Sequence, residues 1–193
     1  MQKLLSYIKP EKSLSRVSAI LITKEKQYPE EVLKHVESFG FGEIQIHTEC
    51  DGVYWRFEKK PRYKDIYVQD DDCTSEIDKI FKAYEGRKIT CGSTDHHIQY
   101  YSNSRICLIG HGVFFPWRRV RVLKKYIKKF GFDDDYKIEI DRIFTFLNYP
   151  QVRISVSVIL LENSYHSNRL SNRKEHAASL RTVENKLKDW KSL

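Results

Sequence analysis

The sequence contains no long apolar run. No segment of its 193 residues approaches the roughly 20 consecutive apolar residues that a membrane-spanning helix needs. Residues 1–13, MQKLLSYIKPEKS, also lack the apolar core and the small-residue cleavage site of a secretory signal. These features predict a soluble, cytoplasmic protein with no membrane partner.

Cysteine is scarce, and its spacing excludes two common kinds of site. The four cysteines, Cys50, Cys73, Cys91 and Cys107, lie far apart and form no C-x-x-C pair. Such a distribution is unlike a zinc site or a disulfide framework. We expect reduced thiols that are mostly buried.

Glycine is also scarce. The eight glycines form neither a G-x-x-x-x-G-K phosphate loop nor a G-x-G-x-x-G dinucleotide fingerprint. Gly110 and Gly112 flank His111 after an apolar segment at 105–109 that is typical of a strand. Two glycines at a strand end permit close approach of the backbone to a ligand, although so short a motif also occurs by chance.

The remaining composition is that of a globular domain with a basic surface. Hydrophobic residues make up 40% and charged residues 31% of a chain long enough for one domain. The formal net charge of +8 favours a polyanionic partner.

Strand and helix patterns alternate along the chain. Strands expected at 16–23 and 43–47 flank a helix expected at 29–40, which predicts a parallel βαβ unit. Further helices are expected at 75–84, 117–130 and 137–148, and further strands at 87–91, 105–109 and 152–161. This alternation predicts an α/β fold.

The segment DIYVQDDDC at 65–73 carries the strongest functional signal. Its apolar residues 66–68 are typical of a strand buried on both faces, and Asp70, Asp71 and Asp72 follow at the carboxyl end of that strand. Ligands of open α/β sheets bind at this edge. Carboxylates there suit Mg²⁺ or Mn²⁺, which keep further positions for water and for substrate phosphates.

Two other interpretations apply to the same carboxylates. They can form a solvated turn, or Asp72 can cap the following helix. A calcium loop is excluded, because Ser75 stands at the required glycine position and Phe81 at the final glutamate position.

The segment 48–64 is rich in aromatic residues and contains Arg56. Its aromatic side chains can stack on a base and its arginines can meet phosphates, or the segment can simply pack on the core.

The helix expected at 117–130 is strongly basic. It is either a solvated face or a surface for nucleic-acid phosphates. Its candidate nucleic-acid-binding residues are Arg118, Arg119, Arg121, Lys124, Lys125 and Lys128.

Asp141 lies on a mostly apolar helix, where an unpaired carboxylate is costly. It is therefore either paired, for example with an arginine, or directed into a cleft, where it can act as a general base. Beyond residue 162, His176 and the nearby Arg173 can fold back over the site, or His176 can be an ordinary surface residue.

Four segments in order, DIYVQDDDC, LIGHGVFF, DRIFTFLN and LSNRKEHAASLR, resemble the nucleotide-sugar-dependent glycosyltransferases of the GT-A fold, especially small phage-like members. The resemblance covers residues 16–185. It implies a Rossmann-like three-layer sandwich with a mostly parallel central sheet. It also implies an N-terminal arm at 1–15, a catalytic domain at 16–162, and a loop and helix at 163–193 that close the active site.

The resemblance further implies roles for individual residues. Asp70 and Asp72 hold Mn²⁺ or Mg²⁺, with His176 completing the metal shell, and Asp71 lies nearer the sugar or ribose. Asp141 matches the base of inverting members, although it lacks the adjacent glutamate usual in the family. The expected donor-binding residues are Thr23, Arg56, Asp70, Asp71, Gly110, His111, Gly112 and Arg173.

The sequence thus predicts a metal-dependent, inverting glycosyltransferase that uses a UDP-sugar. The expected acceptor is a hydroxyl group, with hydroxymethylated pyrimidines of phage DNA as one candidate and a protein or glycan as another. If a phage encodes the chain, it works in the host cytoplasm. A nucleotidyltransferase and a non-catalytic nucleic-acid-binding domain are the alternatives.

Overall fold

A computed structural model of the chain describes residues 13–50, 52–92, 109–131, 134–148, 152–156 and 158–160. The expected closing segment at 163–193 lies outside these residues, as do Cys107, Arg173 and His176. Most of the expected N-terminal arm also lies outside them. Its last residues already belong to the fold, because the short 3-10 helix η1 (Leu14–Arg16) buries Leu14.

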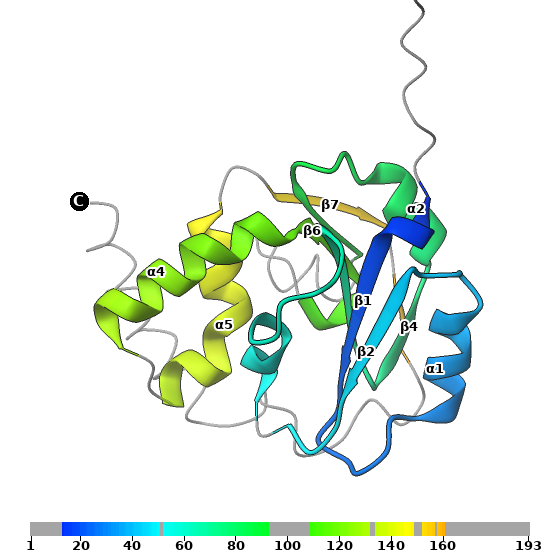
Figure 1. The fold of residues 1–193 in the computed structure, drawn as a ribbon, viewed down its shortest axis with the longest axis horizontal. Coiled ribbons are helices and arrows are strands. Elements are labelled where there is room, and N and C mark those ends of the chain that lie inside the picture. The colour runs from blue at the N-terminus through cyan, green and yellow to red at the C-terminus, as the bar shows by residue number, and fades with distance from the viewer. Residues whose placement is uncertain are drawn as a thin grey trace, which may run out of the picture.

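A six-stranded mixed sheet forms the centre of the molecule (Figure 1). Its order is β2-β1-β3-β6-β5-β7. The strands are β1 (Val17–Ile22), β2 (Glu43–His47), β3 (Asp65–Asp70), β5 (Ile89–Gly92), β6 (Val113–Pro116) and β7 (Val152–Val156). β1 pairs in parallel with β2 and β3, and β5 pairs in parallel with β7, whereas β6 is antiparallel to both of its neighbours. The α/β class is confirmed.

Helices cover both faces of this sheet. They are α1 (Glu30–Glu37), α2 (Ile77–Ala83), α4 (Val120–Phe130) and α5 (Asp134–Leu147). In Figure 1, α4 and α5 lie together on one side of the sheet and α1 lies on the other. Val68 belongs to the core that contains α4 and α5 residues, and its neighbour Tyr67 belongs to the core that contains α1 and α2 residues. Alternate residues of one strand point to opposite faces, so β3 contributes to both cores.

The first βαβ unit and the buried strand agree with the sequence. β1, α1 and β2 follow one another with parallel pairing, as expected. All six residues of β1 are buried, and so are the four central residues of β3. Cys50, Cys73 and Cys91 are buried thiols outside any disulfide, which confirms the expectation for these three cysteines.

Three details of the prediction were wrong. The single strand expected at 152–161 is divided into β7 and β8 (Val158–Leu160), and β8 pairs with β4 (Cys73–Ser75) in a second, two-stranded sheet. The strand β6 was not anticipated, because four apolar residues directly before a helix show no alternation. The helix expected at 137–148 begins earlier, because α5 already starts at Asp134, and acidic residues favour the positive end of a helix.

The described residues include no helix that is both long enough and apolar enough to cross a bilayer.

Candidate active site

The carboxyl ends of β1 and β3 meet at one edge of the sheet. Parallel pairing sets Ile22 opposite Asp70, so the residues that follow these two strands are neighbours. The Thr23 hydroxyl, just past β1, donates a hydrogen bond to the Asp71 carboxylate, just past β3. The carboxylates therefore lie at the strand edge that the sequence predicted.

The turn that carries Asp71 and Asp72 connects β3 to β4. A buried network holds this turn in place: the Gln69 side-chain amide donates to the carbonyl oxygen of Cys73 at 2.8 Å, and the Ser75 hydroxyl donates to Gln69 Oε1 at 2.9 Å. α2 begins only at Ile77, with Glu76 at its N-cap, so Asp72 does not cap that helix. The helix-cap interpretation is excluded.

Arg56 joins two carboxylates that are far apart in the sequence. It lies in the 3-10 helix η2 (Val53–Phe57), and its Nη1 donates to both carboxylate oxygens of Asp141 at 2.9 and 3.1 Å. Its Nη2 forms an ion pair with Asp70. The Arg56 side chain has 0% exposure, whereas the side chains of Asp70 and Asp141 retain 26% and 20%. The two carboxylates thus reach the surface and the cation behind them does not.

The glycine loop packs directly against this ion cluster. The backbone N–H of Ile109 donates to Asp141 Oδ2 at 3.1 Å, in the 3-10 helix η3 (Ile109–His111). A Cβ atom on Gly110 would lie only 1.8 Å from Asp70 Oδ2. Gly112 has a φ of 88°, and a Cβ atom there would lie 2.5 Å from Ser75 Oγ. Both glycines are therefore required for close packing against Asp70 and Ser75, and their approach to a ligand stays a prediction.

Burial and like charge change the acidity of the cluster. Burial raises the pKa of Asp141, the Arg56 guanidinium opposes this shift, and Asp70 adds to it, so the net change is upward. Burial also raises the pKa of Asp71, against the hydrogen bond from Thr23. Burial disfavours the charge of Arg56, but Asp141 and Asp70 outweigh it and raise the pKa of that guanidinium. One cation among three carboxylates leaves an excess of negative charge.

The position of Arg56 differs from the sequence expectation. Arg56 was expected to contact a nucleotide phosphate or base, but it is fully buried and pairs two carboxylates instead. Its neighbour Phe57 packs on the core, with its ring centroid 4.9 Å from that of Phe144. For these two residues, the core-packing interpretation of segment 48–64 is the correct one. For Asp141, the predicted pairing with an arginine is confirmed. The Asp141 side chain is also partly exposed.

The oxygen ligands at this edge suit a hard divalent cation. Among the described residues, no three His, Cys, Asp or Glu side chains are grouped closely enough to form a metal site. The expected third ligand, His176, lies outside the described residues, so the ligand set of Asp70, Asp72 and His176 stays a prediction. Arg173 stays one for the same reason.

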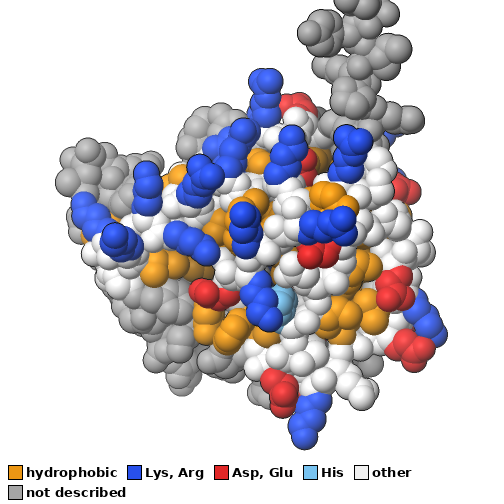
Figure 2. All heavy atoms as spheres, viewed as in Figure 1, with side chains coloured by type: hydrophobic (Ala, Val, Ile, Leu, Met, Phe, Trp, Pro, Cys, Tyr) orange, Lys and Arg blue, Asp and Glu red, His pale blue; other side chains and the backbone are white. Residues whose placement is uncertain are grey.

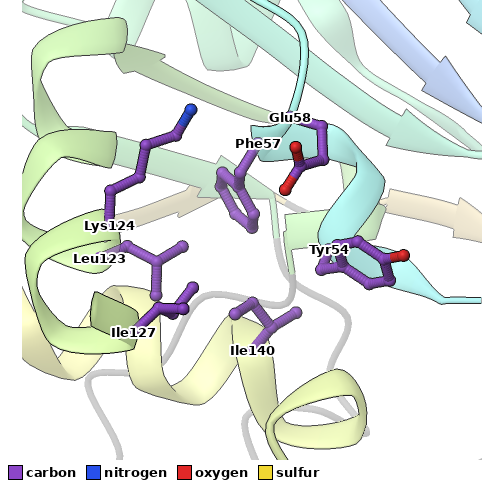
Figure 3. Close-up of a pocket in the computed structure, with 7 residues that line it drawn as sticks. All are labelled: Tyr54, Phe57, Glu58, Leu123, Lys124, Ile127 and Ile140. Atoms are coloured by element: carbon purple, nitrogen blue, oxygen red, sulfur yellow. The ribbon is translucent and has the colours of Figure 1, made fainter. Parts of the chain in front are cut away.

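A hollow of about 450 Å³ lies between η2, α4 and α5 (Figure 3). Its lining residues are Tyr54, Phe57, Glu58, Leu123, Lys124, Ile127 and Ile140. Phe57 directly follows Arg56 in the chain, and Ile140 directly precedes Asp141. Glu58 and Lys124 provide its charged groups, on opposite sides of the hollow in Figure 3.

The basic residues of the expected helix 117–130 lie on η4 (Trp117–Arg119) and α4. Arg119 is only partly exposed and donates from Nε and Nη2 to the carbonyl oxygen of Arg87, at 3.1 and 2.7 Å. It therefore ties this helix to the start of β5. The other five candidates are exposed to solvent: Arg118, Arg121, Lys124, Lys125 and Lys128.

Comparisons of the chain with protein-family models, with curated proteins and with solved structures gave no match. A functional proposal must therefore rest on the chemistry of the site.

Proposed function

We propose that the chain is a metal-dependent glycosyltransferase that moves a sugar from a nucleotide-sugar, with UDP as the nucleotide, to a hydroxyl acceptor. One observation carries this proposal. Thr23, Asp70, Asp71, Gly110 and Asp141, expected from separate segments to form the donor and catalytic sites, converge at the carboxyl ends of β1 and β3. Helices on both faces of the sheet are consistent with the proposed GT-A architecture.

The excess of carboxylates supports a bound cation. Asp70 and Asp72 would hold Mn²⁺ or Mg²⁺, which supplies positive charge to the leaving diphosphate of the donor. Asp70 is already fixed in position by Arg56, and its side chain remains 26% exposed. Gly110 leaves the carboxylate of Asp70 unobstructed by a side chain.

Asp141 is the proposed base. Its carboxylate is partly exposed, and its raised pKa makes it a better proton acceptor than an ordinary aspartate. In the proposed reaction the acceptor O–H proton passes to Asp141, and the acceptor oxygen bonds to the anomeric carbon. The bond to the diphosphate breaks, and the diphosphate leaves with its electron pair. Attack opposite the leaving group inverts the anomeric configuration.

Arg56 and the N–H of Ile109 position this base. Together they direct three hydrogen bonds to the Asp141 carboxylate, which fixes its orientation before a substrate binds. Each carboxylate oxygen can accept more than one hydrogen bond, so an acceptor hydroxyl can still donate to Asp141.

The test is release of nucleoside diphosphate from a panel of nucleotide-sugars with Mn²⁺ and candidate hydroxyl acceptors, including hydroxymethylated DNA. We expect Asp141→Asn to slow turnover by about 10²- to 10⁴-fold, the usual range for a general base, with nucleotide binding retained. Asp78→Asn, at an exposed acidic residue of α2, is the control. Turnover that Asp141→Asn leaves unchanged would contradict the assignment of the base.

A further inference from the structure

A second basic segment lies next to the basic helix. Residues 59–64, between η2 and β3, contain Lys59, Lys60, Arg62 and Lys64, all exposed, and no acidic residue. More than fifty positions separate this segment from α4 in the sequence. The sequence alone therefore does not indicate that the two basic segments are neighbours.

The fold places the two segments side by side. At one end, the backbone N–H of Trp117 donates to the carbonyl oxygen of Lys64 at 2.7 Å. At the other end, Glu58 and Lys124 line the same hollow. The segment is thus bonded at one end to η4, which leads directly into α4, and at its other end it faces α4 across the hollow. Figure 2 shows Lys and Arg side chains gathered over this face.

The basic side chains of this face form no ion pair within the described part of the chain, although Glu43 lies close enough to Arg62 for an electrostatic interaction. Residues 117–130 contain seven Lys or Arg residues and no acidic residue. No ion pair among the described residues involves them or the four basic residues of 59–64. Instead, Lys124 lies over the ring of Trp117 and Arg62 over that of Tyr63, at 5.6 and 5.3 Å from the ring centroids.

We propose that these two segments form one surface that binds the phosphate backbone of a nucleic acid. The surface, called here the basic face, consists of Lys59, Lys60, Arg62, Lys64, Arg118, Arg121, Lys124, Lys125, Lys128 and Lys129. The 11 residues of α4 extend over about 16 Å, which matches about five phosphates along one DNA strand. A regular row of phosphates is complementary to a regular row of cations.

A nucleic acid fits the basic face better than an anionic membrane does. Proteins that bind lipid surfaces insert apolar side chains as well as using positive charge. Within the described part of the chain, Ile46 is the large hydrophobic side chain that is exposed to solvent. It lies on β2, outside the basic face. The aromatic residues at the basic face, Trp117 and Tyr63, are half-buried.

The basic face also leads to the candidate active site. Lys124 belongs both to the basic face and to the hollow in Figure 3, whose lining includes Phe57 and Ile140, the chain neighbours of Arg56 and Asp141. A nucleic acid that extended from the basic face past this hollow would approach the proposed base. This step rests on the proposed function and makes a nucleic acid the acceptor.

Binding is tested by fluorescence anisotropy with a short labelled DNA duplex, without metal or nucleotide-sugar. The test variant is Lys60→Gln, Lys124→Gln and Lys128→Gln combined. Its matched control is Lys34→Gln, Lys79→Gln and Lys82→Gln, which removes the same charge from exposed positions on α1 and α2. We expect the test variant to lose at least about tenfold in affinity at about 0.1 M salt. The slope of the logarithm of affinity against the logarithm of salt concentration should fall in magnitude by about 2 to 3, since each phosphate contact contributes about 0.9. The control should stay within about twofold of the unmodified protein.

Equal losses in both variants would overturn the proposal, as would absence of salt-dependent DNA binding. Binding to phosphatidylserine vesicles in preference to DNA would overturn it in favour of a membrane surface. The DNA-binding result can be separated from the proposed function. The variant Asp72→Asn changes a proposed metal ligand outside the basic face, so it should bind DNA normally. If DNA binding is absent while UDP and Mn²⁺ still bind, the basic face is excluded and the transferase site stands.

Discussion

Charge is organised in opposite ways at the candidate active site and on the basic face. At the carboxyl ends of β1 and β3, a fully buried cation is matched by carboxylates that are fixed by direct hydrogen bonds. On the basic face, exposed cations of one sign lie side by side without ion-pair partners among the described residues. Buried charges must be paired to be tolerated, whereas exposed charges are stabilised by water. The first arrangement gives fixed geometry, and the second gives attraction that salt can tune.

The largest effect on stability is expected from Arg56→Met. Removing the guanidinium leaves Asp70 and Asp141 without their buried partner, which should lower the free energy of unfolding by about 3–5 kcal/mol. Lys34→Met is the control, because it breaks an exposed pair with Glu30 that is worth at most about 1 kcal/mol. Urea denaturation measures both. Similar, small losses would show that the buried cluster does not differ from a surface pair.

Gly110→Ala should have the next largest effect. Its Cβ atom would lie 1.8 Å from Asp70 Oδ2, so the carboxylate or the loop must move, at a cost of about 1–3 kcal/mol. Binding of Mn²⁺ with UDP should weaken in parallel. Gly86→Ala, where a Cβ atom meets no neighbour, should show only the cost of its positive φ and normal binding. Unfolding curves and calorimetric titration distinguish these results, and normal binding by Gly110→Ala would count against the site.

The pH dependence of stability should have opposite signs at Asp71 and Glu43. Asp71 has a raised pKa in the folded state, mainly through burial, so folding favours its protonated form. Its contribution should be present below the usual pKa near 3.8 and be lost as the pH rises through the folded-state value. Asp71→Asn should abolish this loss of stability with rising pH. Thermal unfolding curves recorded at a series of pH values measure the effect.

Glu43 supplies the contrasting case. Burial alone would raise its pKa, but hydrogen bonds from Ser18, the N–H of Arg62 and Gln45 lower it overall. Its contribution should be present above the usual pKa near 4.5 and be lost as the pH falls through the folded-state value. Glu43→Gln should therefore reduce stability at neutral pH. It should also make stability depend less on pH in the acid range of the same thermal unfolding series. If the two substitutions changed the dependence of stability on pH in the same direction, the causes assigned to the two pKa shifts would be contradicted.

The smallest effect on stability is expected from the combined Lys60→Gln, Lys124→Gln and Lys128→Gln change. Exposed cations without partners should alter the free energy of unfolding by no more than about 0.5 kcal/mol, even though DNA binding falls. Thermal unfolding measures the first quantity and anisotropy the second. A large loss of stability would show that these lysines are part of the folded core.

Local features of the chain were predictable, and contacts between distant segments were not. The buried strand at 66–68, the first βαβ unit and the basic helix each follow from residues close together in the sequence. The partner of Asp141 was left open, because Arg56 lies 85 residues away and only the fold brings the two together. The small β4-β8 sheet was missed for the same reason.

The buried polar residue Gln69 was a signal that the sequence did contain. A glutamine inside an otherwise apolar strand must be hydrogen-bonded, and it holds the turn that carries the carboxylates. The pairing of segment 59–64 with α4 left no such local sign. It depends on the register of β3 with β6, where Asp65 lies opposite Pro116.

The most direct test of the central claim is thermal denaturation with Mn²⁺ and a panel of nucleoside diphosphates and their sugars. A ligand that binds only the folded state raises the melting temperature. We predict a rise of a few degrees with UDP or a UDP-sugar that requires Mn²⁺, is lost in Asp72→Asn and persists when the three lysines of the basic face are replaced. No shift with any nucleotide, or a shift that Asp72→Asn retains, would contradict a metal-dependent nucleotide site at the carboxyl ends of β1 and β3.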